Sequence, residues 1–129
     1  MYTINVNHKM PKNPFPIFVI GAGSIVKQAH LPAYAKAGWE IYGIFDINVE
    51  KASALAAVYG IPRVFPELEK AIQTAPMNVV FDIAVPASEL KAILSLLPPN
   101  VGVLMQKPFG ETIEEAKELL EICKQKNLN

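Results

Sequence analysis

A short apolar run that ends in a glycine pair constrains the fold of this chain more than any other feature. Residues 17–20 read Ile-Phe-Val-Ile, and the next three residues are Gly-Ala-Gly. A continuous run of this kind is typical of a strand buried on both faces, as in a parallel sheet. Parallel strands need long crossover connections, which are usually helices. The run therefore predicts a sheet whose strands alternate with helices.

The rest of the chain repeats this alternation. Short apolar runs predict strands at residues 17–20, 40–45, 63–65, 79–85 and 101–105. Segments of helical character follow each run and predict helices at residues 24–37, 49–59, 66–74, 88–97 and 112–126. Right-handed crossovers then give an α/β fold with a doubly wound, mostly parallel sheet and helices on both faces. In such folds, ligands bind at the carboxyl ends of the strands.

Residues with capping preferences mark the ends of the predicted helices. Gly60 directly follows the second helix, where glycine commonly terminates helical structure. Pro66 is expected to start the third helix, and Ser88 is expected to cap the fourth. Thr112 and Glu115 match a capping box at the start of the last helix. These residues support the predicted order of elements.

Length and composition describe one domain of ordinary size. The chain has 129 residues, of which 51% are hydrophobic, with 12 basic and 12 acidic side chains. This balance gives no electrostatic reason to expect a nucleic acid or an anionic membrane as a partner. The single cysteine, Cys123, excludes an internal disulfide and an all-cysteine metal site, and we predict no metal site. No apolar run approaches the roughly 20 residues that span a bilayer.

Residues 1–14 are expected to form a leader ahead of a single α/β domain at residues 15–129. Tyr2, Ile4 and Val6 alternate with polar residues, which fits an edge strand or a disordered segment. The leader is polar and is broken by Pro11, so it does not resemble a signal peptide. We therefore expect a reducing, cytoplasmic setting.

The glycine turn after the first strand has the context of a dinucleotide-binding fingerprint, because it follows a strand and opens a helix. Gly21 permits a tight turn, and Gly23 lets the backbone approach a pyrophosphate closely. The backbone N–H groups at the helix start, around Ser24 and Ile25, then meet the negative charge. Val26 replaces the usual third glycine, which should alter packing more than phosphate contact. The alternative is a purely structural turn.

An acidic residue ends the second predicted strand. Asp46 can accept hydrogen bonds from both ribose hydroxyls of an adenosine, and Ile47 beside it is expected to contact the cofactor. The carboxylate would repel the 2′-phosphate of NADP, and no arginine follows directly; Lys51 is the nearest base. We therefore expect NAD rather than NADP. The alternative role of Asp46 is a cap for the turn or helix at residues 48–50.

Two further motifs stand at the ends of the fourth and fifth strands. Val85 and Pro86 follow the fourth strand, where a nicotinamide ring would lie, although a simple strand terminator explains them equally. Gln106 and Lys107 follow the fifth strand, and Pro108 restricts their backbone to extended geometry. Lys107 can hydrogen-bond a substrate oxygen and help to move its proton as hydride leaves carbon. The alternative is a solvated loop lysine.

Together, these motifs resemble the N-terminal domain of the glucose–fructose oxidoreductase / inositol dehydrogenase (Gfo/Idh/MocA) family. Residues 30–34, His-Leu-Pro-Ala-Tyr, and the pair Tyr59-Gly60 are also similar to that family. The resemblance covers about residues 17–126 and implies a Rossmann domain that is followed by a larger α/β domain. It implies an NAD(P)-dependent oxidoreductase of sugars, cyclitols or related polyols. In the family's Glu-Lys-Pro pattern the lysine contacts the reacting hydroxyl, and that position is Lys107.

The sequence departs from the family pattern at several positions. Gln106 replaces the glutamate, so the position keeps hydrogen-bonding capacity but loses its charge. Leu90 stands where the family often has a histidine. His8 and His30 are the only histidines, and His30 is expected to pack in or near the first helix rather than to act as a base.

The largest departure is length, because 129 residues leave no room for the family's second domain, and we expect the substrate domain to be absent from this chain. The family's second domain supplies most substrate contacts, so we expect a piece of a longer parent that is inactive alone. Its expected partners are a nicotinamide dinucleotide and, in the parent, a small polyol or sugar, with a homo-oligomer possible through the missing domain. Two alternatives use the same fold without redox chemistry: a nucleotide-binding regulatory module and a scaffold that has lost its cofactor.

Overall fold

A computed structural model describes residues 9–129 of the chain. The predicted alternation at Tyr2, Ile4 and Val6 lies outside the described residues. Strands and helices alternate along the chain as expected from the sequence. The strands are β1 (Ile17–Ile20), β2 (Ile41–Phe45), β3 (Val64–Phe65), β4 (Val80–Ile83) and β5 (Gly102–Met105). The helices are η1 (Val26–His30), α1 (Leu31–Ala37), α2 (Val49–Tyr59), α3 (Leu68–Thr74), α4 (Ala87–Leu96) and α5 (Ile113–Gln125).

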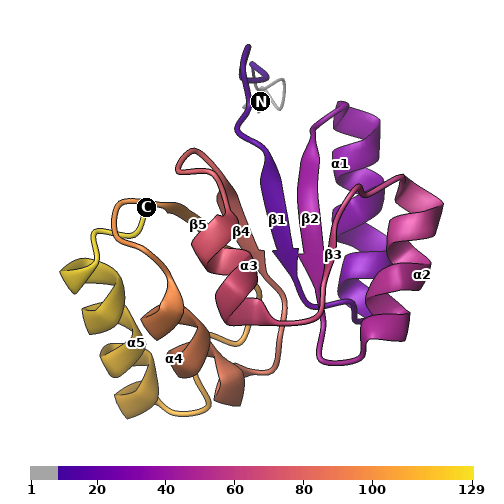
Figure 1. Ribbon diagram of the computed structural model, residues 1–129. Helices are drawn as coiled ribbons and strands as arrows, with labels where there is room; N and C mark the ends of the chain where they lie inside the picture. The colour runs from indigo at the N-terminus through magenta and orange to yellow at the C-terminus, as the bar shows by residue number, and fades with distance from the viewer. Residues whose placement is uncertain (1–8) are drawn as a thin grey trace, which may run out of the picture.

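The five strands form one sheet in the order β3-β2-β1-β4-β5, and every neighbouring pair is parallel. The order reverses between β1 and β4, which is the topological switch point of a doubly wound fold. Helices α1 and α2 cover one face of the sheet, and α3, α4 and α5 lie on the other side (Figure 1). This arrangement confirms the predicted α/β fold with helices on both faces.

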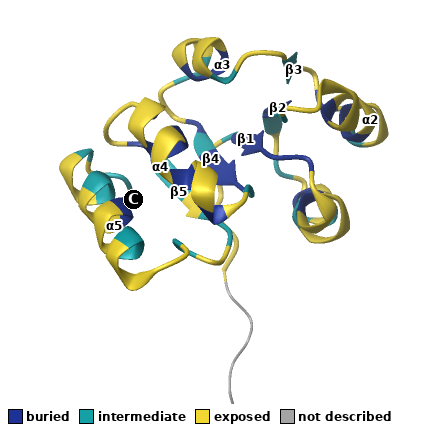
Figure 2. Ribbon diagram, turned by 90° about the horizontal axis from the view of Figure 1, so that it is seen from below, coloured by how far each residue is buried: buried dark blue, intermediate teal, exposed yellow. Residues whose placement is uncertain are grey.

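Two hydrophobic clusters hold the layers together. One cluster joins β1 and β4 to α3, α4 and α5, and Phe18 and Phe81 meet at its centre with ring centroids 5.6 Å apart. The other joins β1 and β2 to α1 and α2, and it contains Val26 at the third position of the glycine fingerprint. Figure 2 shows β1 and β4 as the buried centre of the sheet, with β2, β3 and β5 partly exposed and the outer faces of the helices exposed. The sheet therefore has apolar packing on both faces, as parallel sheets require.

The first helix differs from its prediction, because it is not one regular α-helix. After Ser24 and Ile25, the chain forms the π-helix η1, in which the N–H of Leu31 donates to the carbonyl of Val26. Pro32 follows immediately in α1. Proline has no N–H, and its ring clashes with the carbonyl four residues earlier in a regular helix. A single wider turn is a known way to interrupt a helix, and it is frequent at functional sites.

The predicted helix caps are partly correct. Thr112 caps α5 by accepting a hydrogen bond from the N–H of Glu115, as expected. The prediction for Ser88 is wrong, because α4 begins one residue earlier and Pro86 is its N-cap, without a side-chain bond. The third helix begins at Leu68, two positions after Pro66, so the proline precedes the helix rather than starting it.

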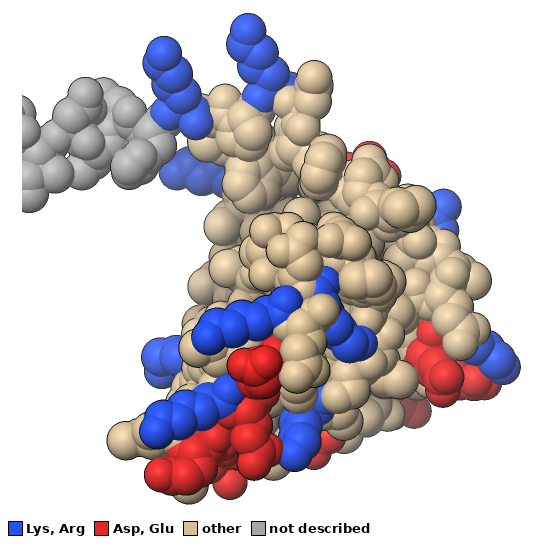
Figure 3. Space-filling model, turned by 90° about the vertical axis from the view of Figure 1, so that its left-hand side faces the viewer, with Lys and Arg blue, Asp and Glu red and all other residues tan. Residues whose placement is uncertain are grey.

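The surface of the described residues carries both signs of charge. On the side of the molecule that α5 occupies, acidic and basic side chains lie next to one another (Figure 3). One such pair joins Lys91 of α4 to Glu118 of α5 at 2.7 Å. None of the helices within residues 9–129 has the length and apolar character needed to cross a membrane.

Candidate functional site

All the motifs singled out in the sequence lie at one edge of the sheet. The glycine turn follows β1, Asp46 follows β2, Val85 comes shortly after β4, and Gln106 follows β5. Because the strands are parallel, their carboxyl ends meet at the same edge, which is the lower edge in Figure 1. The motifs are thus neighbours in space although they span more than 80 positions of the chain, from Gly21 to Gln106.

The two glycines of the turn have different surroundings. Gly21 has a φ of 113°, and a Cβ at this position would lie 2.3 Å from the carbonyl oxygen of Ala84. Its N–H donates to Phe45 at 2.7 Å, so the turn is held between β2 and β4. A Cβ at Gly23, by contrast, would meet no atom within 4 Å. Gly21 is therefore required by the fold, whereas the open space at Gly23 is available to a ligand.

Asp46 holds the glycine turn in place. Its Oδ2 accepts a hydrogen bond from the N–H of Ala22 at 2.7 Å, and its Oδ1 accepts one from Asn48 at 2.8 Å. Asn48, not Asp46, caps α2, by accepting from the N–H of Lys51 at 3.1 Å. Each carboxylate oxygen can accept more than one hydrogen bond. Asp46 thus acts within the turn, as one alternative expected, and keeps acceptor capacity toward solvent.

Several predicted contact residues lie on the surface around this turn. Ser24 and Ile25 are exposed at the start of the first helix, and Ile47 is 94% exposed beside Asp46. An isoleucine this exposed has no packing role in the described chain. Val85 lies on the other side of the turn, with its Cγ1 3.5 Å from the position of a Cβ on Gly21. The structure therefore brings the ends of β1, β2 and β4 together around one turn.

The end of β5 completes the edge. The backbone N–H of Gln106 donates to Ile83 at 3.0 Å, which continues the pairing of β4 with β5. The Gln106 side chain accepts a hydrogen bond from the N–H of Lys107 through Oε1 at 2.9 Å. Lys107 and Pro108 are exposed, and the peptide bond between them is cis. Lys107 thus has an exposed side chain, and its backbone N–H is held by the side chain of the preceding glutamine.

A buried polar cluster lies behind this edge. Asp82 of β4 is fully buried, and its Oδ2 lies 2.8 Å from both the Tyr34 hydroxyl and His30 Nδ1. His30 Nε2 lies 3.1 Å from the amide nitrogen of Gln106. Burial first, and then the hydrogen bond and negative charge of Asp82, raise the pKa of the Tyr34 phenol above its ordinary value. The cluster connects the middle of β4 to the end of β5.

The sequence predictions did not include this cluster. The only signal for it was Asp82 itself, because a carboxylate interrupts an otherwise apolar strand and must find donors when it is buried. Tyr34 and His30 belong to the segment that resembled the family, but nothing in their spacing showed that they face β4. His30 packs beside the first helix, as expected, and it also contacts Gln106.

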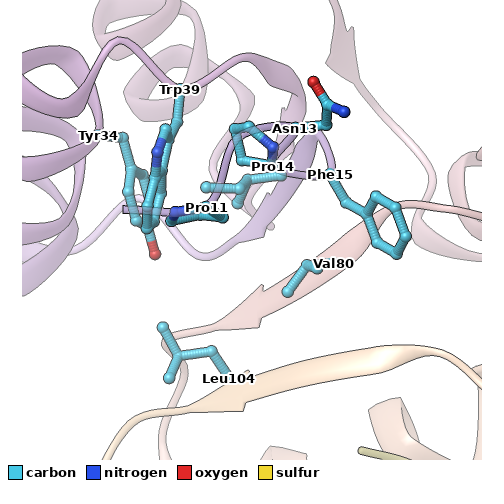
Figure 4. A pocket seen from close by; sticks show the side chains of 9 residues that line it. Pro11, Asn13, Pro14, Phe15, Tyr34, Trp39, Val80 and Leu104 are labelled. Atoms are coloured by element: carbon cyan, nitrogen blue, oxygen red, sulfur yellow. The ribbon is translucent and has the colours of Figure 1, made fainter. Parts of the chain in front are cut away.

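A hollow of about 320 Å³ lies elsewhere, at the opposite edge of the sheet. Its lining is almost entirely apolar and includes the first residues of β1 and β4 together with Tyr34, Trp39 and Leu104 (Figure 4). Tyr34 connects this hollow to the polar cluster through its hydroxyl, but the predicted cofactor-contact residues do not line it. Within residues 9–129, no cluster of three or more histidine, cysteine, aspartate or glutamate side chains could hold a metal ion.

Comparison with known proteins relates this chain to a family of oxidoreductases. A family model described as "Oxidoreductase family, NAD-binding Rossmann fold" (GFO_IDH_MocA) matches residues 15–129. The Salmonella typhimurium protein YceM, which is named as an oxidoreductase, is 29% identical over 113 residues that cover 87% of this chain and 36% of its own length.

Solved structures that are similar to this chain include dehydrogenases. A dehydrogenase, MviM, from Clostridium difficile is 28% identical, with a TM-score of 0.70 over 91% of this chain and 38% of its own. UDP-N-acetylglucosamine 3-dehydrogenase GnnA from Acidithiobacillus ferrooxidans is 27% identical, with a TM-score of 0.72 over 90% of this chain and 37% of its own. The chain thus spans little more than a third of the length of these relatives.

Proposed function

Since the chain belongs to the Gfo/Idh/MocA family of oxidoreductases with an NAD-binding Rossmann fold, we propose that residues 15–129 bind NAD across the carboxyl edge of the sheet. The observation that carries this proposal is the open space at Gly23, where a Cβ would meet nothing within 4 Å. A pyrophosphate needs a backbone that it can approach this closely. The residues present therefore fit the cofactor that the family implies.

The glycine turn would hold the pyrophosphate. The first N–H groups of a helix have no acceptor within the helix, so those around Gly23, Ser24 and Ile25 point toward the ligand. Asp46 fixes the turn through the N–H of Ala22, which sets the position of these donors. Val26 leaves this arrangement intact, because its side chain is fully buried in the cluster that joins β1 and β2 to α1 and α2.

Asp46 and Ile47 would hold the adenosine. The free acceptor capacity of the Asp46 carboxylate suits the two ribose hydroxyls, and the exposed side chain of Ile47 offers an apolar surface beside it. A 2′-phosphate would meet the Asp46 carboxylate as a like charge. We therefore assign NAD as the preferred cofactor over NADP.

The ends of β4 and β5 would serve the reaction. When bound, the nicotinamide ring accepts or gives up hydride. Val85 and Pro86 would flank the ring, because they follow β4 and a Cβ on Gly21 would come within 3.5 Å of Val85. Lys107 would hold the oxygen of the reacting alcohol or carbonyl and move its proton. Gln106 holds the backbone of Lys107.

The substrate class follows from the family proposal. GnnA is a dehydrogenase of a sugar nucleotide, by its name. We propose a sugar, cyclitol or related polyol as substrate of the longer protein, whose further domain would supply most substrate contacts and any oligomer interface. The domain alone would bind cofactor without turnover. A cytoplasmic setting stays a prediction from composition, in keeping with the single free Cys123.

Titration of the chain with NADH tests the pyrophosphate site. Gly23→Ala adds one methyl group in the open space, so we expect NADH affinity to fall at least about tenfold, or about 1.4 kcal/mol, at an unchanged urea midpoint. Gly102→Ala is the matched control, since it makes the same change at the amino end of β5, against Val80. It should keep NADH affinity. Failure of the wild-type chain to bind NADH at millimolar concentration, or equal affinity in Gly23→Ala, would contradict the proposal.

Asp46 is tested by comparing the two cofactors. The wild-type chain should bind NADH more tightly than NADPH. Asp46→Asn removes the negative charge and keeps an acceptor oxygen for one of the two backbone N–H groups, that of Ala22 or that of Asn48, so it should narrow the preference for NADH over NADPH severalfold. Equal affinity of the wild-type chain for the two cofactors would argue against a ribose role for Asp46.

A further inference from the structure

Asp82 is an energetically unfavourable residue at its position in the fold. Its side chain lies in the middle of β4 and is fully buried. Both described donors, the Tyr34 hydroxyl and His30 Nδ1, reach the same oxygen, Oδ2. Among residues 9–129, no donor reaches Oδ1. A buried carboxylate with an unsatisfied oxygen destabilises a fold relative to an apolar residue of similar size. Stability alone therefore does not explain Asp82.

The geometry fixes the direction of every hydrogen bond in the cluster. His30 Nδ1 faces a carboxylate, which only accepts, so Nδ1 carries the proton. In a neutral imidazole, Nε2 is then an acceptor. The group 3.1 Å from Nε2 is the amide nitrogen of Gln106, which donates. The Gln106 oxygen is thereby turned toward the N–H of Lys107, which it accepts at 2.9 Å.

We propose that Asp82 and His30 are positioning residues for Lys107. Asp82 holds His30 as the Nδ1–H tautomer, and His30 orients the Gln106 amide. Gln106 in turn holds the backbone N–H of Lys107, two residues after β5, and so fixes the point from which the lysine side chain extends. The inference rests on the proposed function, because Lys107 matters only if hydride is transferred at this edge.

The same reasoning accounts for the glutamine. A glutamate at position 106 has no proton to give to Nε2, so it would accept from His30 only if the imidazole were protonated on both nitrogens. An amide satisfies a neutral imidazole without adding a charge. Gln106 and Asp82 therefore form a matched pair, with His30 between them.

Nitrogen NMR of the imidazole tests the tautomer directly. The chain has two histidines, so His8→Ala leaves only the signals of His30. At mildly alkaline pH, long-range proton–nitrogen correlations should show a protonated Nδ1 and a bare Nε2. A protonated Nε2 with a bare Nδ1, or an even mixture of both tautomers, would overturn the proposal.

Variants at the two ends of the cluster sharpen the test. Gln106→Glu should place a proton on Nε2, whereas Gln106→Met, which removes the donor without adding a charge, should leave Nε2 bare. Asp82→Asn should abolish the single tautomer. If Asp82→Asn does not fold, the two variants at half-buried Gln106 still decide the matter. Identical imidazole spectra in Gln106→Glu and Gln106→Met would overturn the contact between His30 and Gln106.

Exchange of the Lys107 amide proton tests the positioning itself. Gln106→Met removes the side-chain oxygen that accepts the Lys107 N–H, and Asp82→Asn loosens the hold on that oxygen. Exchange of the Lys107 amide proton should therefore accelerate about fivefold, the equivalent of one net hydrogen bond. Unchanged exchange would overturn the positioning role. These measurements need no cofactor. Failure of NADH to bind would therefore contradict the proposed function alone, while unchanged exchange in a chain that binds NADH would contradict only this inference.

Discussion

The face of the sheet under α3, α4 and α5 is lined by apolar side chains, with Phe18, Phe81 and Leu94 fully buried. The opposite face, under α1 and α2, contains Asp82, which is the buried charged side chain of the described residues. That face is also less completely covered, because Leu104 of the edge strand β5 is 51% exposed. Both faces thus contain an apolar cluster, and the face under α1 and α2 combines its cluster with directed hydrogen bonds to a buried carboxylate near the site.

The largest effect should come from the apolar face. Leu94 lies on α4 and is fully buried against the sheet. Leu94→Ala removes buried methyl groups and leaves a cavity, so we expect the free energy of unfolding to fall by about 3 kcal/mol in urea denaturation. A loss below about 1 kcal/mol would show that this face is not the main source of stability.

The polar face should yield a smaller change. Tyr34→Phe removes the hydroxyl that donates to Asp82 at 2.8 Å, and the His30 contact remains. Because the bond is to a charged group, we expect a loss of about 1.5–2 kcal/mol in the same assay. Tyr42→Phe is the matched control, since its hydroxyl donates to the Thr74 carbonyl at an exposed position. Equal losses of unfolding free energy in the two variants would mean that the charge of Asp82 does not strengthen the hydrogen bond from Tyr34.

The two faces should also differ in alkaline solution. The pKa of Tyr34 is raised in the folded chain by burial and by Asp82. The folded state therefore holds this proton more tightly than the unfolded state. The corresponding stability is complete below about pH 10, the ordinary pKa of tyrosine, and is lost as the pH rises further. Tyr34→Phe should lack this part of the alkaline decline, and parallel decline curves for the two proteins would contradict the assignment.

The smallest effect is expected where the polar face is uncovered. Leu104→Ala makes the same chemical change as Leu94→Ala, but half of the side chain is already in solvent. We expect the free energy of unfolding to fall by less than about 0.5 kcal/mol, as for most surface substitutions. A loss near that of Leu94→Ala would mean that something covers this part of β5 in solution.

The comparison between the faces also separates what the sequence could predict from what it could not. Every strand was predictable, because apolar runs bounded by turn residues identify buried parallel strands such as β1. The shared edge of Gly21, Asp46 and Gln106 followed from the parallel topology alone. These features depend on local patterns and on a general rule of sheet geometry.

The polar cluster of Asp82, His30 and Tyr34 depends neither on a local sequence pattern nor on the general geometry of parallel sheets. His30 and Tyr34 are 52 and 48 positions from Asp82, and only packing of the first helix on the sheet brings them together. The π-helix that orients them was not predictable, because the segment has ordinary helical periodicity. Ser88 was expected to cap α4 from its preference alone, but Pro86 and Ala87 already adopt the start of that helix.

The wide turn of η1 has a consequence for relatives of this chain. It holds one residue more than an α-helical turn, and His30 is its last residue. Removal of one residue inside it, such as Ala29, would let the N–H of Leu31 reach the carbonyl of Val26 as a regular bond between residues four apart. The extra residue alone would be lost, so the helix on either side would keep its phase and His30 would still face Asp82. A one-residue gap at this point of an alignment is therefore compatible with an intact cluster, whereas a gap elsewhere in the first helix would turn His30 by about 100°.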